Sequence, residues 1–413
     1  MADFDLAIVG GGLNGVSIAR DAAGRGLKVL VLEKGDLGAG ASGTASPLIQ
    51  CDLSALEHGR IGEARRAAAE RDIWLRAAPH LVRPVRVVVP MHAEMRPPWL
   101  WRLGLAVHDR LSADRAWPRS ETIDLTHHRL GDPLKRPFGL ALDYGAGLAD
   151  GPRLAIATAS DAVRRGATII AGARCVRADR SEIWRIVAVR RGQRLIFAAR
   201  ALVNATGAWL GTVAETVLRL KPPRILLERS SQIVVRRLFD HDSAYLLQQP
   251  DGRLVHVVPL HGRATLIGSL ERGFAGDPAH AAVTAEDARY LTRAANRYFR
   301  EQLEPSDVLH SVSGIHVRDA SSARAAASGQ GVIRLERKFG EAPLLTSFGG
   351  ETTTARRQAE AAMAALAPFY AMPGPWTAEA TLPSGDVASG DVGGPADGVG
   401  VRWPFPAREP SLA

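Results

Sequence analysis

Cysteine is scarce in this sequence of 413 residues, which holds only Cys51 and Cys175. Two thiols cannot build the disulfide framework of a small secreted protein, and we identify no signal peptide, so we expect reduced thiols and a cytoplasmic location. Long apolar runs are also missing, because none reaches the roughly 18 residues that a membrane-spanning helix needs. The chain is therefore expected to be soluble, or peripheral on the inner face of the cytoplasmic membrane.

Lysine is nearly absent as well. Five of the 52 basic residues are lysines and the others are arginines, with a formal net charge of +9 and an isoelectric point of about 10.1. No basic run or known nucleic-acid-binding motif accompanies this charge, so we predict no nucleic-acid partner. An anionic membrane surface suits the charge better. No metal site is predicted either.

Glycines gather near the N-terminus, in "GGGLNG". The segment contains the motif GxGxxG as Gly10, Gly12 and Gly15, between a predicted buried strand at 5–9 and a predicted helix at 13–23. The first glycine allows a tight turn, the second lets the backbone approach a pyrophosphate, and the third lets helix and strand pack closely. Because the helix N-terminus then faces the phosphates, the motif predicts a dinucleotide site.

A second strand is predicted at 28–32 and ends at Glu33. With the first strand and helix it forms a βαβ unit, which is expected to be parallel and right-handed. A carboxylate at the end of this strand can accept hydrogen bonds from ribose hydroxyls and repels a 2′-phosphate. The acid in register with the glycines strengthens the prediction of a dinucleotide.

Two later motifs favour FAD over NAD. The segment "LVNATGAW" places Ala205, Thr206 and Gly207 at a predicted strand end. The segment "SFGGETTT" places Gly349 and Gly350 before a predicted helix, where backbone N–H groups can reach the flavin or its pyrophosphate. Each motif is weak alone, and their order along the chain is the stronger signal.

The rest of the chain mixes helical and strand patterns. Further predicted elements are helices at 61–77, 153–165 and 285–302, strands at 83–90, 167–170, 231–237, 244–249, 253–260 and 264–270, and a β-meander at 175–207. The segment 96–111, "RPPWLWRLGLAVHDRL", is amphipathic, and it either packs on its own domain, which we prefer, or dips into a membrane surface. The residues after Thr377 are rich in Gly, Pro, Ala and Asp, which predicts poor order.

Longer segments carry a resemblance that reaches to about residue 385. From "FDLAIVGGGLNGVSIARDAAGRGLKVLVLEKGDLGAGAS" through "AERDIWLRAAPHLVRPVRVVVP", "AYLLQQPDGRLVHVVPL", "IGSLERGFAGDPA" and "SVSGI" to "LLTSFGGETTT", the sequence resembles the FAD-dependent, quinone-linked glycerol-3-phosphate dehydrogenases of bacteria. These motifs are specific to the family rather than general to dinucleotide-binding proteins.

The resemblance implies an α/β fold. It consists of a Rossmann-like FAD-binding domain of the glutathione-reductase and p-hydroxybenzoate-hydroxylase type, with an inserted antiparallel β-sheet substrate domain. We accordingly expect an FAD-binding domain at 1–78, 145–224 and 330–370, a substrate or cap domain at 79–144 and 225–329, and a poorly ordered tail at 371–413. The family usually adds a C-terminal helical domain, for which we expect no room in this chain.

The resemblance also implies a reaction. A hydroxyl-bearing carbon of sn-glycerol 3-phosphate gives hydride to N5 of the flavin, a base takes the hydroxyl proton, and quinone reoxidises the flavin. The substrate phosphate needs cations, preferably the fork of an arginine. This chain departs from the family at those positions: Pro47 and Glu351 replace lysines, Gln50 and Gln232 replace histidines, Cys51-Asp52 replaces Gly-Gly, Ser54-Ala55 replaces Arg-Tyr, and His316 replaces an arginine.

The site residues follow from the motifs and the resemblance together. The candidate catalytic residues are His316 and Glu351, at family positions with altered residues. The candidate substrate residues are Gln50, Gln232, Arg237 and Arg318. The candidate FAD-binding residues are Gly10, Gly12, Leu13, Asn14, Gly15, Glu33, Lys34, Ser42, Ser46, Ala205, Thr206, Gly207, Gly349 and Gly350.

These substitutions make the site electrostatically unfavourable for a phosphorylated substrate. A carboxylate at Glu351 about 4 Å from a phosphate oxyanion costs on the order of 4 kcal/mol per unit charge at an effective dielectric constant of 20. The family's lysine would contribute a similar amount with the opposite sign. Arg236, Arg237 or Arg318 could offset some of this, although Arg237 is also consistent with a solvated strand end. His316 reads as a base, as a partial cation or as a neutral hydrogen-bonding residue.

Three hypotheses remain open at this point. The first is a flavin oxidoreductase that oxidises glycerol 3-phosphate. The second is a flavin enzyme with a different substrate, such as an amine or a polyol, for which Glu351 and Asp52 are suited. The third is a catalytically inactive relative that binds FAD or only keeps the fold.

Overall fold

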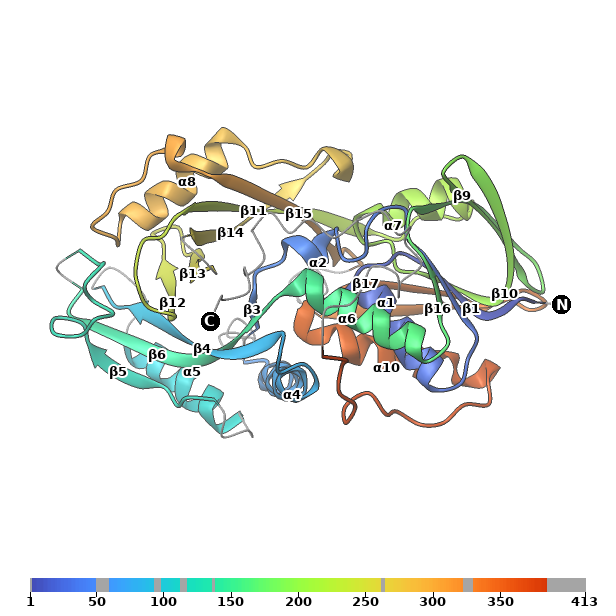
Figure 1. The fold of residues 1–413 in the computed structure, drawn as a ribbon, viewed down its shortest axis with the longest axis horizontal. Coiled ribbons are helices and arrows are strands. Elements are labelled where there is room, and N and C mark those ends of the chain that lie inside the picture. Colours follow the sequence, from blue (N-terminus) through green and yellow to red (C-terminus); the bar gives the residue numbers. More distant parts are fainter. Residues whose placement is uncertain are drawn as a thin grey trace, which may run out of the picture.

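The computed structural model has two lobes, each built on one sheet (Figure 1). The structure describes residues 2–49, 59–92, 98–111, 117–135, 138–260, 264–321 and 330–384. The first lobe holds the N-terminal βαβ unit, and the second holds the strands between residues 225 and 319. None of the described helices is long and apolar enough to cross a membrane.

The sheet of the first lobe runs β16-β17-β10-β1-β2-β7, with β9 and β8 added to β10. Strands β10, β1, β2, β7 and β17 pair in parallel, while β16, β8 and β9 join antiparallel. This confirms the predicted meander that returns to the parallel sheet. Its strands are β1 (Phe4–Val9), β2 (Val29–Leu32), β7 (Thr168–Ile170), β8 (Ala173–Arg180), β9 (Trp184–Arg190), β10 (Gln193–Asn204), β16 (Gly331–Glu336) and β17 (Leu344–Gly349).

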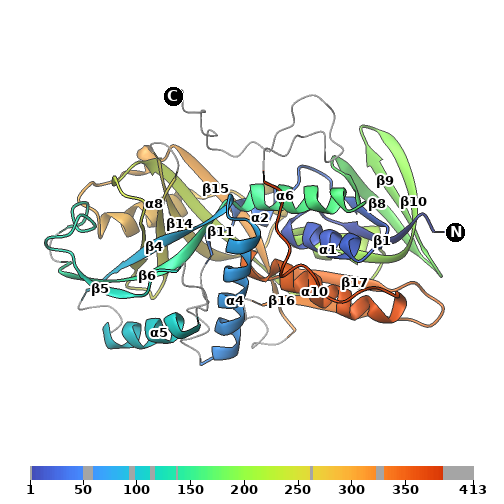
Figure 2. The same ribbon diagram turned by 60° about the horizontal axis from the view of Figure 1, so that its bottom comes forward.

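Both faces of this sheet are covered, which explains why β1 is an apolar run without alternation. Leu6 and Ile8 pack toward the helices, and Ala7 and Val9 pack toward β8 and β9. The covering helices lie side by side on one face: α1 (Leu13–Gly24), α6 (Gly151–Arg164) and α10 (Ala355–Leu366) (Figure 2). Small side chains let these helices approach closely, since Ala19, Ala22 and Ala23 of α1 are all buried.

The sheet of the second lobe runs β15-β11-β14-β13-β12-β4-β6-β3, with β5 paired to β6. Neighbours pair antiparallel except β12 and β4. Its strands are β3 (Leu48–Ile49), β4 (Val82–Pro90), β5 (Glu121–Asp124), β6 (Leu140–Ala149), β11 (Ile225–Arg236), β12 (Ala244–Gln248), β13 (Leu254–Pro259), β14 (Ala264–Phe274) and β15 (His310–Asp319).

Three helices pack against or beside this sheet. They are α4 (Ile61–Ala77), α5 (Pro98–Leu111) and α8 (Ala285–Asn296), with α4 between the two lobes in Figure 2. Shorter helical segments are α2 (Ala41–Thr44), α7 (Leu210–Thr212), a π-turn at Val213–Val217 and 3₁₀ turns at Gly207–Trp209, Pro278–His280, Pro305–Asp307, Thr352–Thr354 and Ala367–Phe369.

The lobes divide the chain slightly differently from the predicted boundaries. Strand β6 pairs with β4 as far as Ala149, so the second sheet keeps the chain five residues beyond the expected change at 144–145. Strand β3, which falls in a segment expected to belong to the FAD-binding domain, also joins this sheet. The hydrophobic pattern does not predict which sheet β3 and the end of β6 join, because either sheet would accept an apolar segment.

The predicted helix at 285–302 was too long, since α8 ends at Asn296. The side chain of Asn296 donates to the carbonyl of Leu303 (2.8 Å) and accepts from its N–H (2.7 Å). Beyond the helix, Phe299 forms an isolated β-bridge with Leu134. An asparagine that bonds the backbone ahead of it ends the helix, although the apolar spacing continues.

Residues 371–384, here called the strap, correct the expectation of a poorly ordered tail from 371 onward. The strap packs on the first lobe, and the guanidinium carbons of Arg20 and Arg165 lie 4.9 Å and 3.9 Å from the ring centroid of Trp376. The N–H of Leu382 donates to the carbonyl of Ala77 (2.6 Å), at the end of α4. The composition of the strap does not predict this packing, because the arginines that contact the strap are far away in the sequence. The tail beyond 384 lies outside the described residues.

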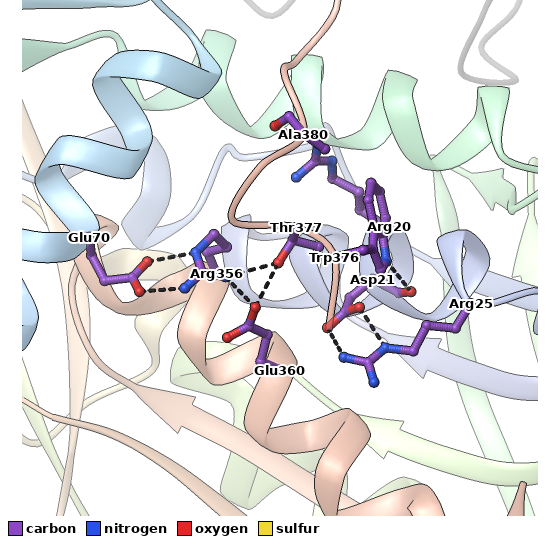
Figure 3. A network of polar contacts seen from close by, with 9 residues as sticks. All are labelled: Arg20, Asp21, Arg25, Glu70, Arg356, Glu360, Trp376, Thr377 and Ala380. Atoms are coloured by element: carbon purple, nitrogen blue, oxygen red, sulfur yellow. Dashed lines mark hydrogen bonds and ion pairs between the residues drawn. The ribbon is translucent and has the colours of Figure 1, made fainter. Parts of the chain in front are cut away.

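A buried ionic cluster joins the strap to α4 and α10 (Figure 3). Arg356 of α10 donates to Glu70 of α4 (2.8 Å) and to the hydroxyl of Thr377 (3.0 Å), and it also pairs with Glu360. Arg356 and Glu70 are almost fully buried, and removing one partner of such a pair costs about 3–5 kcal/mol. The cluster therefore fixes α10, and with it the Gly-Gly turn that precedes α10, against α4.

Candidate functional site

A cavity of about 1000 Å³ opens between the two sheets. It extends from the glycine turn after β1, past the ends of β2 and β17, to strands β13, β14 and β15 of the second lobe. Almost all the residues predicted to bind FAD line it, as do His316, Arg318 and Glu351. Segments from four distant parts of the sequence therefore meet at one site.

The turn at Gly10 requires glycine for two reasons. Gly10 has φ of +112°, and a Cβ there would lie 2.4 Å from the carbonyl oxygen of Ala205. A Cβ on Gly15 would lie 2.0 Å from the carbonyl oxygen of Gly10. Gly15 is not among the described residues that line the cavity, so it acts by packing α1 on the turn.

The N-terminus of α1 faces the cavity. Gly12 is its N-cap and makes no side-chain capping bond, while the N–H of Leu13 donates to the hydroxyl of Ser42 (2.9 Å). The side chain of Asn14 donates to the carbonyl of Gly349 (3.1 Å), which joins this turn to the late Gly-Gly turn. Uncapped backbone donors at a helix start are suited to a pyrophosphate.

Glu33 is anchored at the end of β2 by both carboxylate oxygens. They accept hydrogen bonds from the N–H groups of Gly11 (2.7 Å) and Gly35 (2.8 Å). Beside it, the ammonium of Lys34 lies 3.0 Å from the ring centroid of Trp209. Burial lowers the pKa of Lys34, although the charge of Glu33 opposes this. Trp209 was missed as a site residue, and its place directly after "ATGA" was the available signal.

The turn that follows β17 has a backbone conformation that favours glycine. Gly349 and Gly350 have φ of +67° and +77°. The N–H of Glu351 donates to the hydroxyl of Thr354 (2.9 Å), which starts the 3₁₀ turn that leads into α10. Both glycines and Glu351 line the cavity. A positive φ at two successive positions directs backbone groups toward whatever fills this space.

Strands of the second lobe contribute polar side chains to the opposite wall of the cavity. His316 and Arg318 share one face of β15, and Arg318 pairs with Glu228 of β11 and with Glu271 of β14 (3.3 Å). Burial is the main cause of a lowered pKa at His316, with Glu271 and Glu228 acting in the opposite direction. At neutral pH, His316 is therefore an uncharged imidazole that can accept a proton.

Sequence reasoning missed Glu228, Glu271 and His256 at this site. Glu271 and His256 line the cavity, and burial lowers the pKa of His256 to about 4. Glu228 lies opposite His316 in the strand pairing. The signal that could have found the two glutamates is alternation along β11 and β14. It becomes useful only once the register is known, and a bulge between Ser231 and Ile233 shifts that register.

Three predicted substrate residues are not found in the cavity lining that the structure describes. Arg237 was misplaced: it follows β11, donates to the carbonyl of Phe239 (2.7 Å) and does not line the cavity. Five residues of extended chain, about 17 Å, separate it from Gln232. Gln232 is buried and donates to the carbonyl of Thr44 (2.7 Å), so it supports α2. Gln50 lies outside the described residues.

Comparison with known proteins agrees with this geometry. The sequence model of a family described as FAD dependent oxidoreductase matches residues 5–355. The chain is 40% identical over 389 residues to a glycerol-3-phosphate dehydrogenase of Pseudomonas aeruginosa, covering 93% of this chain and 75% of the relative. It is 36% identical over 411 residues to the D-erythritol 1-phosphate dehydrogenase of Brucella abortus, covering 98% and 82%.

Solved structures share the fold. The glycerol-3-phosphate dehydrogenase of Bacillus halodurans, complexed with FAD, matches with a TM-score of 0.70 and 22% identity over 92% of this chain and 68% of that one. The L-α-glycerophosphate oxidase of Mycoplasma pneumoniae, with FAD bound, matches with a TM-score of 0.72 and 16% identity over 92% and 99%. At these identities the likeness concerns the fold.

Proposed function

We propose a function that starts from one fact: this chain belongs to the FAD dependent oxidoreductase family, within its glycerol-3-phosphate dehydrogenases. It is an FAD-dependent enzyme, and we assign it the oxidation of a hydroxyl-bearing carbon of a small molecule, with quinone as the electron acceptor. The observation that carries the assignment is that one cavity joins the glycine-lined cofactor cradle to the imidazole of His316.

The residues present fit FAD. The uncapped start of α1 suits the pyrophosphate, the anchored carboxylate of Glu33 suits the ribose hydroxyls, and the cavity has room for an extended ligand. At the turn after β17, Gly349 and Gly350 let the cofactor approach the backbone closely. When bound, FAD supplies a flavin that accepts hydride at N5.

The chain's own residues then have defined tasks. As the C–H bond of the substrate gives up its electron pair, His316 takes the proton of the hydroxyl, so that the alcohol carbon becomes a carbonyl. The second sheet covers the site and limits access of water. The names of the relatives make glycerol 3-phosphate and D-erythritol 1-phosphate the first substrates to test. A second candidate, a different alcohol or an amine, is favoured by the pairing of Arg318 with two carboxylates.

The function is tested by the flavin spectrum of the purified protein. We expect a yellow protein whose absorbance near 450 nm (an approximate flavin value) bleaches on anaerobic mixing with a hydroxylated substrate and returns on addition of a soluble quinone. A panel of glycerol, polyol phosphates and amino alcohols covers both candidates. Colourless protein that cannot be reconstituted with FAD contradicts the proposal, and so does a bound flavin that no compound of the panel bleaches.

Membrane contact is proposed through one end of α5. Its first two turns expose Trp99, Leu100 and Leu103, at 66%, 39% and 58%, while Trp101 and Leu105 are buried in the second lobe. The helix thus packs on its own domain, as preferred from the sequence, and still presents an apolar edge. Such an edge on a basic protein suits the inner, anionic face of the cytoplasmic membrane.

Replacing Trp99 and Leu103 together by serine is expected to reduce binding to anionic vesicles about tenfold or more, because each buried apolar side chain contributes about 1.5–3 kcal/mol. Co-sedimentation with vesicles containing a third of phosphatidylglycerol measures it. A matched control is Leu140→Ser, which alters an exposed leucine on β6 instead of on α5. Equal sedimentation of the double variant and the wild type contradicts this membrane contact.

A further inference from the structure

The only arginine that the described part of the second sheet presents to the cavity is already paired. The guanidinium of Arg318 contacts Glu228 through Nε, and its Nη2 lies 3.3 Å from Glu271. All three side chains are partly exposed, so the group is solvated from the cavity side. We call Glu228, Arg318 and Glu271 the carboxylate bridge. It carries one more negative than positive charge.

A further carboxylate faces the bridge from the first lobe. Glu351 lines the same cavity. Burial lowers the pKa of Arg318, but the hydrogen bond and charge of Glu228 and the charges of Glu271 and Glu351 together raise it above its ordinary value. The pKa values of His256 and His316 are both lowered by burial, so neither imidazole adds positive charge at neutral pH. Glu271, Glu351 and Arg318 therefore line the cavity together, and Glu228 adds a third carboxylate through its pairing with Arg318.

A phosphate ester fits this arrangement poorly. A forked arginine binds a phosphate through two parallel N–H···O bonds, and here those donors are directed at Glu228 and Glu271. A phosphate that used this pair of donors would have to displace both carboxylates while lying near Glu351. An ammonium group is compact, brings three donors and no acceptor, and meets acceptors already in place.

We infer, on the basis of the function proposed above, that the substrate is a small amino alcohol: a hydroxyl-bearing carbon for the flavin, with a protonated amine held by Glu271 and Glu351. Glu228, Glu271 and Glu351 are then specificity-determining residues. They replace the recognition of phosphate with recognition of a cation on the same scaffold.

Three ligands with one carbon skeleton test the charge preference: glycerol 3-phosphate, glycerol and 3-amino-1,2-propanediol. Calorimetric titration of the FAD-loaded protein at pH 7 measures their dissociation constants without relying on turnover. We expect the amino diol to bind at least about tenfold more tightly than glycerol 3-phosphate, with glycerol between them. The preference should shrink as salt is raised, because it is electrostatic. The inference is overturned if the amino diol does not bind, or binds no more tightly than the phosphate.

The variant Glu271→Gln tests the bridge itself. It keeps the shape of the side chain and removes one charge, so we expect the amino diol to bind about threefold to tenfold more weakly and glycerol 3-phosphate to bind more tightly. The matched control is Glu301→Gln, which removes the same charge from a surface pair with Arg236 (2.7 Å) outside the cavity lining. Equal effects of the two variants overturn the assignment of specificity to the bridge.

Flavin bleaching separates this inference from the proposed function. If a polyol phosphate bleaches the flavin and the amino diol neither binds nor bleaches it, the oxidoreductase assignment stands and the amino alcohol is wrong. If no hydroxylated compound bleaches the flavin, the proposed function itself fails, whatever the order of the dissociation constants.

Discussion

Replacing Gly15 by alanine is expected to leave a folded protein that retains less than about a tenth of the FAD of the wild type. The new Cβ would lie 2.0 Å from the carbonyl oxygen of Gly10, a separation that cannot persist. The obstacle is backbone, so α1 must move away from the turn. The donors at the helix start then leave the pyrophosphate, and a misplacement of about 1 Å can cost on the order of 100-fold.

The measurement is the ratio of flavin to protein absorbance after reconstitution with excess FAD, with circular dichroism as the check on folding. The matched control is Gly104→Ala in α5, where a Cβ would meet nothing within 4 Å. Alanine favours a helix in both variants, so helix propensity does not separate them. A Gly15→Ala protein with a full complement of FAD would show that α1 does not need this close approach.

The cofactor end of the site could be predicted because its determinants are local. Gly10, Gly12 and Gly15 lie within one turn, and Glu33 ends the strand that the same βαβ unit positions. The positive φ of Gly10 favours glycine there, and the carbonyl oxygen of Gly10 leaves no space for a Cβ at Gly15, so both requirements arise within this short segment. The late turn at Gly349 required more, since it reaches α1 only through the parallel pairing of β17 with β10.

The substrate end could not be predicted to the same extent, because it depends on pairing across strands. Glu228 and Glu271 meet Arg318 only when β11 lies between β14 and β15 in one register. A shift by one residue would turn these side chains to the opposite face. The resemblance drew attention to His316 and Glu351, and both line the cavity, but it also pointed to Arg237, which follows β11 and does not line the cavity.

The packing of the strap also could not be predicted from nearby sequence. Its own composition predicts disorder, yet Arg20, Arg25 and Arg356 bind its carbonyls and its threonine. Gly24 leaves the space that Trp376 fills, since a Cβ there would lie 2.0 Å from the indole ring. Arg20 and Arg25 lie more than 300 residues away in sequence from the carbonyls they bind, so no window of neighbouring residues contains all of the information.

Replacing His316 by alanine is expected to slow anaerobic flavin reduction about 10²–10⁴-fold, with little change in substrate affinity, because a positioned base contributes a factor of that size. FAD content should be unchanged, since the cofactor cradle lies on the other lobe. Stopped-flow bleaching of the flavin measures the rate. The control is His310→Ala on the same strand, outside the cavity lining. If His256→Ala causes the loss instead, the base is His256.

The pH dependence of the same rate adds a test that a structural role would not satisfy. A base works in its unprotonated form, and burial lowers the pKa of His316 below the ordinary value of 6.5. The rate should therefore be constant from pH 8 down to about 6.5 and fall only at lower pH. The charge of Glu271 raises this pKa, so Glu271→Gln should move the fall to still lower pH. A fall that begins above pH 6.5, or one that Glu271→Gln moves upward, contradicts His316 as the base.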